Sequence, residues 1–389
     1  MQKAVLRFAF LALPVAVAGW AGCSSSDGSA TPTPDAGPEA APVADALPPV
    51  DSSLVDAAPP KRDCAADLQA DGLAMHLDCT GLYSDLAAKT VALENKPYTP
   101  GVQFWSDGAV KSRFLYLPPG ATIDIASFDE WKFPNGTKVW KEFVVGGKRI
   151  ETRMFAKAKG TWARTTYRWN DAETDAVRKD GGEKVMIPGQ AAIYEIPNSG
   201  QCDYCHMGRT DQLLGVEAVS LGLAAAQGVT LASLKADGRF SAAPPTTSII
   251  IPEDGTMKAA AALGWLHANC GGCHNGNADA AANILNPPLW FLMKPSQLVP
   301  EAGTAAVTDL DAWTTAVNID STRSNVDAGV PYKRIVKGDA AHSLVSILSG
   351  RRATGTEEPN AIIQMPPLVT RQVDTAGHAL LDAWITAIP

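Results

Sequence analysis

Two groups of residues, 202–206 and 270–274, could bind a redox cofactor covalently, and they share one spacing. In each group two cysteines stand three positions apart, and a histidine follows the second cysteine directly. Thiols at this spacing can attack the two vinyl groups of haem, which holds the histidine under the iron as its proximal ligand. The sequence therefore predicts two covalent c-type haems, bound by Cys202, Cys205, His206, Cys270, Cys273 and His274.

Three other roles compete with haem for these cysteines. Four thiols can hold a zinc ion, although the two pairs are 65 residues apart, from Cys205 to Cys270. A dithiol redox site is the second alternative, and two structural disulfides are the third. Neither zinc nor a dithiol gives a reason for the histidine, and a disulfide across a two-residue CxxC loop is strained.

A haem iron has a sixth position, and Met365 is the best candidate ligand at the second motif. It stands in the stretch 364–368, Gln-Met-Pro-Pro-Leu, where prolines fix the backbone of a loop. A Met/His ligand pair raises the reduction potential relative to two histidines. His342 and Met293 are poorer alternatives, and Met365 could instead be a core side chain.

The first motif has no obvious sixth ligand. Met207 adjoins His206 and cannot reach the opposite face of a haem. The first iron could equally be five-coordinate. That would bear on function, because an iron with a free sixth position binds small ligands. The candidates elsewhere in the chain are Met154, Met186, His76 and His267.

The chain begins like an exported protein. Lys3 and Arg7 precede an apolar run at 8–18, and small residues stand before Cys23, as in a cleaved signal peptide over 1–22. Residues 20–23 also resemble the lipobox of bacterial lipoproteins, which implies that Cys23 is lipidated. An ordinary secreted protein is the alternative. Because the next residue is Ser and not Asp, the outer membrane is favoured, facing the periplasm or the cell surface.

The segment 23–63 is rich in Ser, Pro, Ala and Asp, and this composition predicts a disordered tether. Cys64 and Cys79 follow it, and export to an oxidising compartment makes them a candidate disulfide. The net charge is −8, so nucleic acid is excluded as a partner, whereas an exported redox protein with a basic surface remains compatible.

The folded part is predicted to be α+β and multidomain. A β-rich haem domain over 64–228 is followed by a connector over 229–255 and an all-α, cytochrome c-like domain over 256–389. Short alternating runs with turn residues between them predict the strands, and Asn135-Gly136 predicts a tight hairpin. The expected strands are 114–117, 131–133, 138–145 and 161–169, and the expected helices are 212–225, 257–269 and 375–388.

Several stretches resemble a family of bacterial exported haem c-type proteins, and the match runs from Tyr98 to the C-terminus. The resemblance implies two CxxCH segments. The matching stretches are 104–113, 131–137, 141–143, 151–153, 167–170, 266–270 and 365–367.

The first domain alone also resembles the lysine-crosslinked haem cytochromes that oxidise hydroxylamine, and their non-crosslinked relatives that bind nitric oxide. The stretch 133–137, a strand at 141–143 and a terminal CxxCH carry this likeness. It implies a β-sheet domain with the haem at its edge. Lys138, Lys141 and Lys157 are the candidate crosslinking residues, and ordinary exposed strand lysines are the alternative interpretation.

Two haems in an exported protein favour electron transfer between exported redox partners. A haem enzyme is the alternative, either a peroxidase or a small-nitrogen-compound oxidoreductase, with the first haem catalytic and the second an electron relay. A ligand sensor or carrier without turnover is a third hypothesis. The sixth position of each iron distinguishes these functions, because haem chemistry depends on that position.

Overall fold

The computed structural model of the protein describes residues 62–389 except 190–192, 286, 301–303, 324–325, 328 and 355–356. The predicted signal peptide, Cys23 and nearly all of the predicted tether lie outside the described residues. Lys61–Pro389 form one compact unit. Within its described part, no helix has the length and apolar character needed to cross a bilayer.

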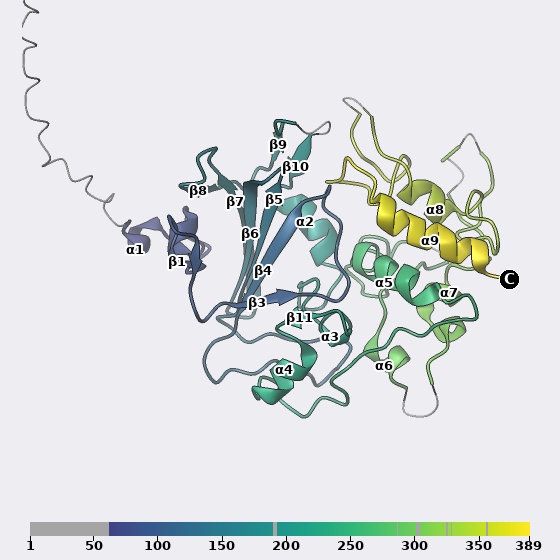
Figure 1. The fold of residues 1–389 in the computed structure, drawn as a ribbon, viewed down its shortest axis with the longest axis horizontal. Coiled ribbons are helices and arrows are strands. Elements are labelled where there is room, and N and C mark those ends of the chain that lie inside the picture. The colour runs from purple at the N-terminus through teal and green to yellow at the C-terminus, as the bar shows by residue number, and fades with distance from the viewer. Residues whose placement is uncertain are drawn as a thin grey trace, which may run out of the picture. The chain divides into compact units, whose positions relative to one another are not determined.

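The main sheet of the described chain is antiparallel and has seven strands, in the order β11-β3-β4-β5-β6-β7-β8 (Figure 1). Its members are β3 (Lys96–Thr99), β4 (Val110–Tyr116), β5 (Lys138–Val145), β6 (Lys148–Ala158), β7 (Thr161–Trp169), β8 (Ala176–Arg178) and β11 (Gln227–Gly228). Two small sheets pair β1 (Tyr83–Asp85) with β2 (Thr90–Val91), and β9 (Glu183–Val185) with β10 (Tyr194–Ile196).

All named elements that follow β11 in the described chain are helices. Helix α5 packs against α9, and both lie in the C-terminal half (Figure 1). The helices are α1 (Cys64–Asp67), α2 (Ser199–His206), α3 (Ala218–Gly222), α4 (Leu231–Ala236), α5 (Ala259–Asn269), α6 (Pro295–Leu298), α7 (Asp311–Thr314), α8 (Leu344–Ser349) and α9 (Thr375–Ala387), with 3-10 turns at Leu77–Cys79 and Val307–Asp309.

The two faces of the main sheet pack against different parts of the chain, because successive side chains of a strand point in opposite directions. On β5, Trp140 joins a cluster with the N-terminal segment around Leu77. Val139, on the other face, belongs to a large cluster that also includes Leu263 of α5 and Trp384 of α9. This second face is the one that meets the cysteine motifs.

The predicted combination of a large antiparallel sheet with helices is confirmed, as are the strands at 138–145 and 161–169, but a separate all-α domain is not shown, since Lys61–Pro389 form one compact unit. The predicted helix over 212–225 is wrong, because only Ala218–Gly222 is helical. Gln212 has φ 57° and Gly215 has φ 77°, and a right-handed helix excludes both values.

The predicted hairpin at Asn135-Gly136 is also wrong. The partners of β5 are β4 and β6, and Lys132 forms an isolated bridge with Asp124. The Gly136 amide donates to the Lys157 carbonyl at 2.7 Å, which continues the β5–β6 pairing backward through the turn. The turn itself is present, since the Thr137 amide donates to the Pro134 carbonyl at 3.3 Å, but the described strands that flank it do not pair as a hairpin.

The predicted pair Cys64 and Cys79 is joined by a disulfide in the structure. It closes a loop with a sequence separation of 15 at the N-terminal end of the described chain. The side chain of His76, within this loop, is 2.7 Å from a carboxylate oxygen of Asp67.

Candidate haem sites

The first motif occupies the C-terminal part of α2, from Cys202 to His206. Asn198 caps the helix, because its side chain accepts from the Gln201 amide while the Gln201 side chain accepts from the Asn198 amide. This reciprocal cap fixes the start of a short helix. Residues three and four apart share one helix face, so Cys202 lies on the same side as Cys205 and His206.

The second motif follows the end of α5. Cys270 terminates the helix, and the His274 amide donates to the Cys270 carbonyl at 2.8 Å. A Cβ atom on Gly208, just after the first motif, would overlap the Gly272 carbonyl oxygen. The backbones of the two motifs therefore pack directly against each other, although they are far apart in the sequence.

The first cavity, which is partly open to solvent, includes Cys202, Cys205 and His206 in its lining. Strands β4, β5 and β6 supply one wall, on which Val139 and Phe155 are apolar. Charged side chains share that wall, and they come from Lys111, Arg113, Lys141 and Arg153. The cavity thus combines the first motif with a strongly cationic surface.

The second cavity, which is also partly open to solvent, includes Cys270, Cys273, His274 and Met365 in its lining. Most of the remaining lining is apolar. It comes from Ala281, Ala282, Leu285, Leu289, Phe291, Leu344, Val345 and Leu348.

The two cavities adjoin. Cys205 lines both of them, as do Phe104, Pro366 and Pro367. The Cys205 and Cys273 sulfur atoms are 3.8 Å apart, and all four motif cysteines are free thiols. Groups attached to these two sulfurs would therefore be neighbours.

Both motif histidines are suited to bind a metal as neutral imidazoles. The Nδ1 atom of His206 is 2.6 Å from the Gln212 carbonyl oxygen. Since a carbonyl only accepts, Nδ1 carries the proton and the Nε2 lone pair is free. Burial lowers the pKa of His206 to about 3 and that of His274 to about 4. The Nδ1 atom of His274 makes no hydrogen bond with the described residues.

The loop that carries Met365 is held by hydrogen bonds on both sides. The Met365 amide donates to the Leu348 carbonyl at 2.9 Å. Gln364 is fully buried; its side chain accepts from the Ala353 amide and donates to the carbonyls of Pro366 and Thr370. The Met365–Pro366 peptide bond is cis. The hydrogen bonds of Met365 and Gln364 give the loop a defined shape where it meets the second cavity.

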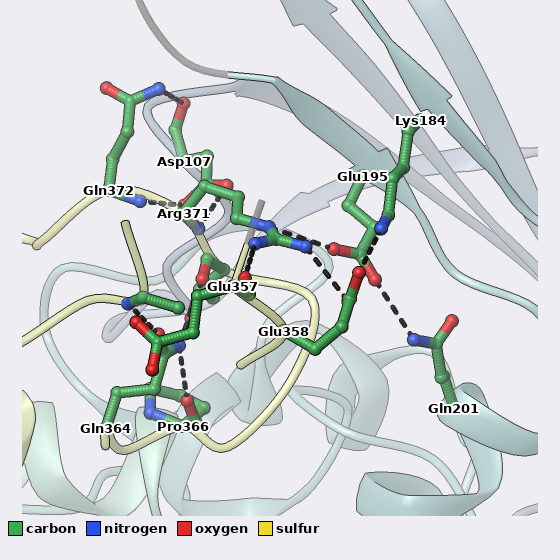
Figure 2. A network of polar contacts seen from close by, with 12 residues as sticks. Asp107, Lys184, Glu195, Gln201, Glu357, Glu358, Gln364, Pro366, Arg371 and Gln372 are labelled. Carbon is green, nitrogen blue, oxygen red and sulfur yellow. Dashed lines mark hydrogen bonds and ion pairs between the residues drawn. The ribbon is translucent and has the colours of Figure 1, made fainter. Parts of the chain in front are cut away.

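A polar network ties this loop to the first half of the chain (Figure 2). The amides of Arg371 and Gln372 donate to the two carboxylate oxygens of Asp107 at 2.8 and 3.0 Å. The Arg371 guanidinium lies 3.3 Å from Glu195, which accepts from Gln201 of α2 at 3.0 Å. The network thus runs from the Met365 loop to the helix of the first motif.

Five of the other candidate sixth ligands lie outside the described lining of the two cavities. For the second motif, Met293 is buried in the large cluster and His342 is exposed beside Asp339. For the first, Met154 is buried on the opposite sheet face, and Met186 is exposed. Neither these four residues nor His76 contribute to the described lining of the two cavities.

His267 lines the first cavity, but its ring is engaged. Its Nδ1 atom accepts from the Met293 amide at 3.0 Å, which leaves the proton on Nε2. That Nε2 atom is 3.4 Å from the carboxylate of Glu217. Burial raises the pKa of this carboxylate, but the hydrogen bond to His267 and the attraction of nearby positive charges outweigh burial and lower it to about 2. In this tautomer His267 offers no free lone pair to a metal.

The three lysines named from the sequence lie in different places. Lys141 lines the first cavity, whereas Lys138 lies on the opposite face of β5 and donates to the Thr80 carbonyl at 3.0 Å. Lys157 forms an ion pair of 2.5 Å with Asp211. Only Lys141 of the three is therefore beside the first motif.

Sequence reasoning missed the cations of both cavities. Lys111, Arg113 and Arg153 line the first, and Arg323 and Arg334 line the second. Period-two alternation along the strands could have placed the first three on one face of the sheet. It could not have shown that this face is the one that meets the motifs. The two arginines of the second cavity stand in loops, where no periodic signal exists.

Comparison of the chain with protein-family models, curated proteins and solved structures finds no match. In the part of the chain that the structure describes, no three His, Cys, Asp or Glu side chains converge as ligands of a bare metal ion. Two free thiols and a neutral histidine in each cavity are nevertheless the donor set that covalent haem attachment requires.

Proposed function

We propose that this protein is a di-haem c-type cytochrome that transfers electrons between exported redox partners. One observation carries the proposal: two adjoining cavities each contain a CxxCH motif, and the Cys205 and Cys273 sulfurs are 3.8 Å apart. When bound, haem supplies one-electron chemistry. The chain contributes the attachment sites, their proximity and the environment of each site.

The residues around the second cavity fit a buried haem with two ligands. His274 and Met365 line the same cavity, and its apolar lining would exclude water. Arg323 and Arg334 also line this cavity and could offset the negative charge that a haem would bring; within the described residues their guanidinium groups donate to backbone carbonyls, including those of Ala361 and Thr315. We propose that 256–389, in which every named element of the described residues is a helix, is a cytochrome c-like domain.

The first test is haem stoichiometry. The mature protein should carry two haems that acid–acetone extraction does not remove, and it should contain no zinc, because each motif supplies two thiols for thioethers. Intact mass and metal analysis measure both quantities. Cys202→Ala with Cys205→Ala should leave one haem, and so should Cys270→Ala with Cys273→Ala. A wild-type mass that corresponds to one haem would remove one motif from the proposal.

We also propose that Cys23 carries a lipid anchor, which places the protein in the outer membrane facing the periplasm or the cell surface. The apolar run and the small residues before Cys23 support this. Cys23→Ser should release the protein into the soluble exported fraction or block its processing, as fractionation and N-terminal mass would report. Ser24→Ala is the matched control and should stay membrane-bound. A wild-type protein that is soluble and free of lipid contradicts the anchor.

The alternative is a haem enzyme that acts at the first cavity. The observation that favours it is the asymmetry of the two cavities. The first has a cationic wall, and no described methionine lines it, whereas the second is mostly apolar and has Met365. An open sixth position at the first site would suit peroxide or a small nitrogen compound, with the second site as an electron relay.

A further inference from the structure

One face of the main sheet presents a row of positive charges to the first cavity. Arg113 of β4, Lys141 of β5 and Arg153 of β6 are directly opposite one another in the strand register. Lys111 stands two residues before Arg113, on the same face of β4. We name these four residues the cation row, and all of them line the cavity.

Three members of the cation row lack a carboxylate partner. Arg153 pairs with Glu151, at 2.6 and 2.9 Å, but among the described residues no carboxylate oxygen lies within 4.0 Å of the other three cations. Their hydrogen bonds go to neutral oxygens: Lys111 to the Phe104 carbonyl at 2.6 Å, Arg113 to the Gln103 side chain at 3.1 Å and Lys141 to the Leu214 carbonyl at 3.2 Å.

This arrangement is unfavourable without a negative charge in the cavity. Like charges directly opposite each other on neighbouring strands destabilise a sheet, and buried charges require partners. Arg113 is 5% exposed. Burial, together with the neighbouring cations, lowers the pKa of Lys111 and of Lys141 to about 7. An anion beside the row would relieve both the desolvation and the repulsion.

The carboxylates of the cavity lining are already engaged. Glu195 pairs with Arg371, and Glu217 accepts from the Val219 and Ser220 amides and faces His267. The inference rests on the proposed function in one respect, since a bound haem brings two propionates. Two negative charges offset two of the three unpaired cations, so a positive charge remains.

The row lies beside a further hollow of the surface. This hollow shares Phe104, Trp105 and Lys111 with the first cavity. Its lining includes Val110, which is 70% exposed. Lys111 therefore stands where the cavity meets a hollow that is open to solvent.

We propose that the cation row binds a small oxyanion from solution, of the size of nitrite or a short carboxylate. The planar guanidinium of Arg113 suits two oxygens of one planar anion, and the lysine amines add point charges beside it. The row would thus select anionic over neutral solutes at the first cavity.

Calorimetric titration of the oxidised holoprotein with nitrite tests this. The wild type should bind nitrite, and the affinity should fall as chloride is raised. Lys141→Met should weaken binding by about tenfold or more, the effect of losing a hydrogen bond to a charged group. Lys138→Met, on the same strand but the opposite face, should change it by less than about twofold, as changes away from a site do.

Lys111→Met serves as a second variant in case Lys141→Met does not fold, and thermal melting reports which variants are folded. No heat of binding in the wild type would overturn the proposal and would mean that the haem propionates alone satisfy the row. Equal weakening by Lys138→Met would overturn it too, as would unchanged binding in both Lys141→Met and Lys111→Met. The haem content of the same samples tests the proposed function separately.

Discussion

Met365→Ala should lower the reduction potential of the second haem by on the order of 0.1 V, within the roughly 0.8 V that axial ligands span. The thioether of a Met/His pair favours ferrous iron, and the variant removes it. The weak charge-transfer band at the red edge of the oxidised spectrum should vanish, while the first haem keeps its potential. Redox titration followed by absorbance measures both effects.

Leu348→Ala is the matched control, because Leu348 lines the same cavity but has no donor atom. It should keep the charge-transfer band even if it lowers the free energy of unfolding by about 2–5 kcal/mol, as buried leucines do. If Met365→Ala leaves both spectra unchanged, Met365 is a core side chain. A band lost in both variants would instead indicate a collapse of the cavity.

Carbon monoxide should bind to one of the two reduced haems in the wild type, and that haem should be the first. The physical reason is the difference between the cavities. Met365 faces the second, whereas in the described lining of the first the only histidine besides His206 is His267, whose ring is engaged. Optical titration gives the number of carbon monoxide molecules bound per chain.

The variant Met365→Ala tests the same assignment from the second haem. It should bind two carbon monoxide molecules per chain, because both irons then have an open position. Two bound in the wild type would show that Met365 is not a ligand. None bound would show that both irons are six-coordinate, which favours electron transfer over catalysis. The amine of Lys141 would then be the first candidate ligand to replace, with Lys138 as the control on the opposite face.

Some of the architecture could be predicted because its signals are local. The alternation over 138–145 and 161–169 and the helical spacing near the C-terminus depend only on neighbouring residues, and the structure has β5, β7 and α9 there. The predictions at 212–225 and at Asn135-Gly136 failed for different reasons. Positive φ values at Gln212 and Gly215 exclude a helix there, and β5 pairs with β4 and β6 and not with the segment before Asn135.

The sequence by itself pointed to the residues of the two candidate sites, because the CxxCH spacing and the prolines after Met365 can be read directly from the chain. It also singled out Cys64 and Cys79, which the structure joins. Only the tertiary structure decided that the two motifs touch, that Met365 faces the cavity of His274, and that Lys141 faces the first cavity while Lys138 does not. Spacing along the chain fixes which atoms can react. Burial of apolar surface from distant segments decides which sheet face is covered, and therefore which of those atoms meet.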